Sequence, residues 1–136
     1  MMLFKLFTGV AGVYHVMLGL SGLVLPHELF ARVAAIVLGI QSEMDTTFRL
    51  VAKFASVYVL VFGICILIFM MNPQKYRVIA IPVLALFGIR LINKIVYFGS
   101  ITESFSISTG QGIFAISSLA VLFFGILFTL PKKEEV

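Results

Sequence analysis

Two short strings of the sequence place cations where they could bind a ligand inside a membrane. Each string has the form Arg-Leu-x-x-Lys, and the two begin at Arg49 and Arg90. The Arg and the Lys of each string are four residues apart, so both lie on one face of a helix. Both strings lie in or beside long apolar segments. A cation within a membrane span is costly, so each string is a candidate functional site.

A guanidinium and an ammonium on one helix face can bind an anionic group. The planar guanidinium of Arg90 suits a carboxylate or a phosphate, because it can donate two parallel hydrogen bonds. We therefore predict ligand-binding residues in both strings and in the first apolar segment. These residues are Arg49, Lys53, Arg90, Lys94, Asn93 and His15.

Two interpretations of the cations remain open. In the first, carboxylates of the neighbouring loops fold over the strings and form a structural ion-pair network; the expected counter-charges are Glu43, Asp45 and Glu103. In the second, the cations line an outward-facing, water-filled pocket that binds a phospholipid headgroup, a small oxyanion or a polar quinone head. Like charges at this spacing repel each other, so both interpretations require negative charge nearby.

His15 is a polar side chain in the middle of the first apolar segment. Gly12, His15, Gly19 and Gly22 fall on one helical stripe. Small residues on a stripe let a neighbouring helix approach closely, so we expect His15 to face protein rather than lipid. Its role is then a neutral side chain bonded to another helix, a ligand-contacting or proton-carrying group, or a metal or haem ligand. The last role is disfavoured, because no other span contains a histidine.

The composition is typical of an integral membrane protein. Hydrophobic residues make up 61% of the chain and charged residues 12%, whereas a soluble domain has about 25% charged residues. The net charge of +4 is spread without a basic run, which excludes a nucleic-acid partner. The single cysteine, Cys65, excludes an internal disulfide. No nucleophile–base set, metal-ligand set or phosphate loop is recognisable, so we predict no catalytic residue, metal or cofactor.

Four apolar segments are long enough to cross a bilayer, which takes about 20 helical residues. They cover residues 4–25, 48–71, 78–98 and 111–130. We expect the first to be retained, because its apolar run exceeds the roughly 7–15 residues of a signal peptide. The sequence therefore predicts an all-α fold, with residues 1–136 forming one antiparallel bundle of four transmembrane helices.

The connections between these segments have their own patterns. The apolar stretch around Arg32, after Pro26, is shorter than the roughly 20 residues of a span and predicts a short interfacial helix. Asp45 is placed to cap the second span. Residues 99–110 are rich in Ser and Thr, and we expect a polar loop there.

Four spans would place both termini and the turn at 72–77 on one side. That side collects Lys5, Lys75, Arg77, Lys132 and Lys133. By the positive-inside rule it is cytoplasmic. The short turn makes the second and third spans an antiparallel hairpin, so we expect the two strings to meet near the outer face.

Several of these features together resemble a known family. A first span closed by Pro26, a longer outer connection, Arg49, Gly63 and Arg90 resemble the DoxX-like superfamily of small four-helix membrane proteins, in a branch of unknown function. The resemblance covers roughly residues 5–130. It implies a four-helix fold in the inner (plasma) membrane of a bacterium. It also implies a link to redox enzymes, because a DoxD-type relative is a subunit of a quinone-reducing sulfur enzyme.

Three functions remain open at this point. The first is a small non-catalytic membrane protein, either an accessory subunit or a binder of a lipid-like or anionic ligand in the basic pocket. The second is a membrane subunit of a quinone-level redox enzyme, with His15, Arg90 and Tyr58 around the quinone head. The third is a small transporter or channel protomer. Membrane lipid is an expected partner, with a larger membrane complex or a homo-oligomer as further alternatives.

Overall fold

The computed structural model describes residues 1–40 and 45–131. All regular elements within these ranges are helical, which confirms the all-α prediction. In chain order they are α1 (Met2–Val24), α2 (His27–Leu38), α3 (Thr46–Met71), the 3-10 helix η1 (Arg77–Ile79), α4 (Ala80–Val96), α5 (Phe98–Ser104) and α6 (Thr109–Thr129).

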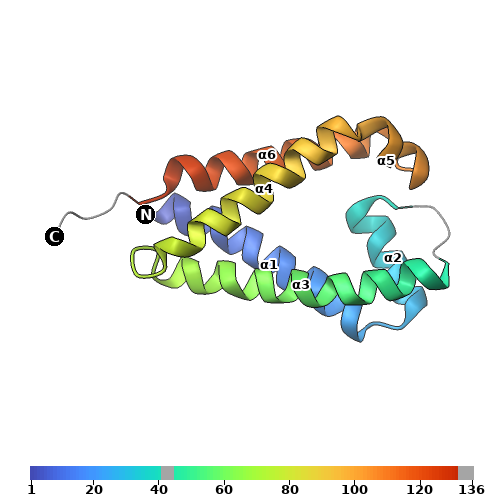
Figure 1. Ribbon diagram of the computed structural model, residues 1–136, viewed down its shortest axis with the longest axis horizontal. Coiled ribbons are helices and arrows are strands. Elements are labelled where there is room, and N and C mark those ends of the chain that lie inside the picture. Colours follow the sequence, from blue (N-terminus) through green and yellow to red (C-terminus); the bar gives the residue numbers. More distant parts are fainter. Residues whose placement is uncertain (41–44, 132–136) are drawn as a thin grey trace.

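Four helical segments of the described chain are long and apolar enough to cross a membrane. They are Met2–Val24, Thr46–Met71, Arg77–Val96 and Thr109–Thr129, close to the predicted ranges. In Figure 1, α1 begins and α6 ends at the same end of the molecule as the turn between α3 and η1. Helices α2 and α5 lie at the opposite end.

Local sequence signals set the ends of two helices. Helix α2 ends at Gly39, whose φ of 73° lies in the left-handed region, where glycine is favoured. Asp45 caps α3 as predicted, because its carboxylate accepts a 2.6 Å hydrogen bond from the Phe48 N–H.

The prediction of a polar loop over residues 99–110 is wrong for its first half. Phe98–Ser104 form α5, and the hydroxyl of Thr102 donates 2.9 Å hydrogen bonds to the carbonyls of Phe98 and Gly99. Serine and threonine side chains bonded to their own backbone are compatible with a short helix. Polar composition alone therefore did not distinguish this helix from a loop.

Helices α1 and α3 form the most extensive helix pair of the molecule. The predicted stripe of small residues on α1 is buried against α3. A Cβ added at Gly19 would lie 2.6 Å from the backbone nitrogen of Leu60, and one added at Gly63 would lie 2.6 Å from that of Val16. The two backbones therefore approach too closely for side chains, a common way to pack helices in membranes.

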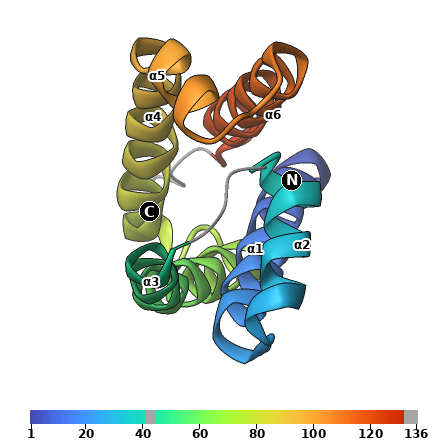
Figure 2. The same ribbon diagram turned by 90° about the vertical axis from the view of Figure 1, so that its right-hand side faces the viewer.

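Helix α4 packs on α6 and diverges from α3. Figures 1 and 2 both show α4 moving away from α3 as it leaves the turn. Phe62 of α3 and Phe87 of α4 still contact each other, with ring centroids 6.1 Å apart. Beyond this contact the ends that carry the two cationic strings separate, unlike the meeting expected from the short turn.

The close α1–α3 packing predicts a specific stability change. Gly19→Ala should lower the free energy of unfolding by about 1–3 kcal/mol, because the added methyl overpacks against the Leu60 backbone. Thermal unfolding in detergent, followed by circular dichroism, measures the change.

Gly88→Ala is the matched control in α4. Its Cβ would lie 3.4 Å from the Phe123 ring, an ordinary contact, and alanine favours a helix over glycine. This variant should be as stable as the unmodified protein or more so. Equal stability of the two variants would contradict the packing described here.

Candidate ligand-binding site

His15 connects two helices that are distant in the sequence. Its side chain is only 2% exposed. Its Nδ1 lies 2.7 Å from the carbonyl oxygen of Ala11, and its Nε2 lies 3.0 Å from Nη1 of Arg90 on α4. A carbonyl only accepts and a guanidinium only donates. Nδ1 therefore carries the proton and Nε2 accepts, which assigns a neutral imidazole in one tautomer.

Three aromatic rings surround this imidazole. Tyr14, Phe62 and Phe87 contact His15 edge to face, with centroid distances of 5.3, 5.3 and 5.6 Å. Such arrangements are favourable for ring systems. Because the rings lower the local dielectric, the bond from Arg90 is stronger than it would be in water.

Arg90 keeps its positive charge and most of its hydrogen-bonding capacity. A guanidinium has five N–H donors, and the bond to His15 uses one of them. Arg90 is partly buried and lies six residues before the end of α4 at Val96, roughly 9 Å along the helix. Within residues 1–40 and 45–131, no hydrogen bond or ion pair joins Arg90 to a carboxylate.

Lys94 and Asn93 follow Arg90 on α4. Lys94 is partly buried and lies beside Phe98 and Thr102, at a small space between α4, α5 and α6. Arg90 and Lys94 are four residues apart on α4, so the two cations lie one helical turn apart. Asn93 is exposed. The second string therefore provides two cations one helical turn apart, of which Arg90 is bonded to His15.

The first string, which begins at Arg49, lies on α3. Arg49 and Lys53 are exposed on α3, and Arg49 has an interaction partner of its own. Lys53 is nine residues from Phe62, or roughly 14 Å along the helix. Of the predicted ligand-binding residues, the structure brings together His15 and Arg90, and Lys94 follows one helical turn after Arg90 on α4.

The predicted counter-charges do not neutralise this cluster in the part of the chain that the structure describes. Glu43 lies outside the described residues. Asp45 caps α3, and Glu103 is exposed on α5. Neither of these two carboxylates pairs with Arg90 or Lys94. The ion-pair network involving Glu43 stays a prediction.

From the sequence we placed Tyr58 with His15 and Arg90 around a quinone head and missed Tyr14. Tyr58 is 77% exposed and is not among the rings that contact His15. The ring of Tyr14 contacts that of His15. Tyr14 lies off the glycine stripe, and its position directly before His15 was the available signal.

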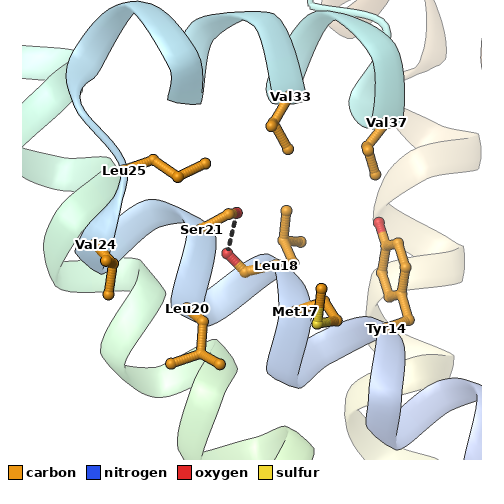
Figure 3. Close-up of a pocket in the computed structure, with 9 residues that line it drawn as sticks. All are labelled: Tyr14, Met17, Leu18, Leu20, Ser21, Val24, Leu25, Val33 and Val37. Atoms are coloured by element: carbon orange, nitrogen blue, oxygen red, sulfur yellow. Dashed lines mark hydrogen bonds between the residues drawn. The ribbon is translucent and has the colours of Figure 1, made fainter.

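Sequence reasoning also missed an apolar groove of about 540 Å³ between α1 and α2. Figure 3 shows Val33 and Val37 of α2 facing α1 across the groove, with the Tyr14 hydroxyl directed toward Val37. The Ser21 hydroxyl donates a 2.7 Å hydrogen bond to the Leu18 carbonyl. The polarity of Ser21 is thereby satisfied, so the lining of the groove is effectively hydrocarbon.

Comparison with known proteins adds no assignment. No family model and no curated protein matches the sequence, and no solved structure matches the fold. No group of three or more His, Cys, Asp or Glu side chains that could hold a metal lies within the described ranges. The site is therefore interpreted from its own chemistry.

The His15–Arg90 bond predicts non-additive mutant stabilities. His15→Leu should lower the free energy of unfolding by about 1–3 kcal/mol, because it leaves a partly buried donor of Arg90 without an acceptor. His15→Gln should cost less, since its amide oxygen can still accept. Thermal unfolding in detergent measures both.

The double variant His15→Leu/Arg90→Leu, together with Arg90→Leu alone, completes a double-mutant cycle. Replacing both partners by apolar groups leaves no unsatisfied donor, so it should cost less than the sum of the single variants. Strictly additive costs would show that the two side chains do not interact.

Proposed function

We propose that this chain is a small non-catalytic membrane protein that binds the anionic head of a lipid-like ligand at Arg90 and Lys94. The hydrogen bond from Arg90 to neutral His15 carries the proposal. It holds a guanidinium within a membrane-spanning helix and leaves its charge uncompensated by any carboxylate of the described chain.

Electrostatics in a low-dielectric site favours an anion there. Removing a charge from water is costly unless a counter-charge approaches it. A carboxylate or phosphate can accept two parallel hydrogen bonds from the remaining donors of Arg90. Lys94, one helical turn further on, adds a second positive charge. Such a ligand would supply the counter-charge that Arg90 does not receive from the described part of the chain.

The proposal includes an arrangement in the membrane. The four long helices cross in alternating directions as an antiparallel bundle, and α2 lies at the interface. The end with the α3–η1 turn faces the cytoplasm, in the inner membrane of a bacterium. Lys5, Lys75 and Arg77 near that end support this orientation by the positive-inside rule. Membership of the DoxX-like superfamily belongs to the same proposal.

A quinone-level redox subunit is the second candidate. One observation favours it: Tyr14, His15 and Arg90 lie together among phenylalanine rings. The free N–H groups of Arg90 could donate to a quinone carbonyl. In this case the bound molecule would be neutral rather than anionic.

Native mass spectrometry of protein purified in mild detergent tests the proposal. The unmodified protein should carry an anionic lipid-like adduct. Arg90→Gln should reduce its occupancy roughly tenfold or more, since a hydrogen bond to a charged group contributes about 1.5–3 kcal/mol. Lys94→Gln should reduce it in the same direction.

Lys75→Gln is the matched control. Lys75 is exposed in the turn at the other end of the molecule, so this variant should keep the adduct. Equal occupancy in Arg90→Gln would contradict the proposal. A neutral quinone as the bound species would favour the second candidate.

A further inference from the structure

The groove between α1 and α2 is a place where a hydrocarbon chain can lie. Its volume of about 540 Å³ falls within the about 300–1,000 Å³ that is usual for small-molecule sites. It lies along the second half of α1, which is a candidate membrane span. An apolar space of this kind excludes water and accepts apolar molecules.

The length and volume of the groove indicate the kind of molecule that fits in it. Its lining extends from Tyr14 of α1 to Leu25, the residue directly after α1. These two residues are 11 apart in sequence, or roughly 16 Å along a helix. A single extended hydrocarbon chain fits this length and volume.

One end of the groove adjoins the cationic cluster. Tyr14 lines the groove and contacts the ring of His15, which accepts the hydrogen bond from Arg90. Figure 3 shows the Tyr14 hydroxyl at that end of the groove, while Leu25 lies at the other end. Tyr14 therefore connects the groove to the residues that hold Arg90.

We propose that the groove holds the chain of a long-chain carboxylate, whose head binds Arg90 beside Tyr14. This inference rests on the proposed function and names the ligand class. The head must be small, because Arg90 lies well inside the span. A carboxylate is small, planar and matched to the guanidinium fork. A phospholipid has a larger head and two chains, while the groove accommodates one.

The two parts of the ligand contribute differently. A hydrocarbon chain in the groove adds affinity through close packing against the lining side chains. The head–Arg90 contact adds a preference for a carboxylate over a neutral head, and the groove selects the length and number of chains. This division makes the two parts separately testable.

Binding of three probes to the delipidated protein in detergent tests the inference: oleate, oleyl alcohol and acetate, by native mass spectrometry. Oleate should bind roughly tenfold or more tightly than oleyl alcohol, because only oleate pairs with Arg90. Acetate should bind much more weakly than oleate, because it lacks the chain. In Arg90→Gln the preference for oleate over oleyl alcohol should disappear.

Val33→Phe fills the groove from α2 and should abolish binding of both long-chain probes. Ile36→Phe is the matched control, because Ile36 is 83% exposed on the same helix and does not line the groove. It should bind as the unmodified protein does. Circular dichroism and thermal unfolding show whether each variant is folded.

If Val33→Phe does not fold, an oleate with a photoreactive group on its chain replaces it. Labelling should concentrate on Leu18 and Ser21, and excess oleate should suppress it there but not at exposed Val13. Labelling without such selectivity would overturn the inference.

Separate outcomes overturn the inference and the proposed function. Oleate binding that survives in folded Val33→Phe, or exclusive retention of a two-chain phospholipid, would overturn the groove inference and leave an anion site at Arg90. Equal affinity for oleate and oleyl alcohol would overturn the anion site itself. Preferential binding of a quinone would overturn both.

Discussion

A charged guanidinium inside a membrane-spanning helix needs a hydrogen-bonding partner. For Arg90 this partner is His15. The bond to His15 joins residues 75 positions apart and connects α1 to α4. The acceptor in this bond is a neutral imidazole, which is an unusual partner for an arginine within an apolar segment. The imidazole can serve because the Ala11 carbonyl fixes its tautomer. The connection therefore holds the cation in place without cancelling its charge.

Helix α1 presents different faces to different neighbours. The glycine face packs against α3 so closely that Gly19 and Gly63 cannot carry side chains without displacing backbone. His15 lies on this same face and meets Arg90 where α4 approaches. The neighbouring face, which begins at Tyr14, lines the groove beneath α2. The tightest packing in the fold thus positions both the polar bond and the apolar groove, and an amphipathic ligand is the chemistry that could use both.

Sequence periodicity predicted the features that depend on one helix at a time. The four apolar segments, the burial of His15 on the glycine stripe and the Asp45 cap follow from spacing and local hydrogen bonding, and the structure confirms them. Features that depend on how helices stand relative to one another were not predictable. The length of the 72–77 turn does not determine the angle at which α4 leaves α3. The separation between α2 and α1 that creates the groove is not indicated by any local sequence pattern. The partner of Arg90 was sought among the carboxylates, whereas a buried neutral histidine can also accept its hydrogen bond.

The most direct measurement of the central claim is the protonation pattern of the His15 ring, read from ¹⁵N chemical shifts of histidine-labelled protein in lipid bilayers at neutral pH. His27→Asn leaves His15 as the only histidine and makes the assignment unambiguous. The structure predicts a neutral ring with the proton on Nδ1, an unprotonated Nε2, and a change at Nε2 on replacing Arg90 by Gln. A proton on Nε2, or a fully protonated ring, would contradict the claim that neutral His15 holds Arg90 in the membrane.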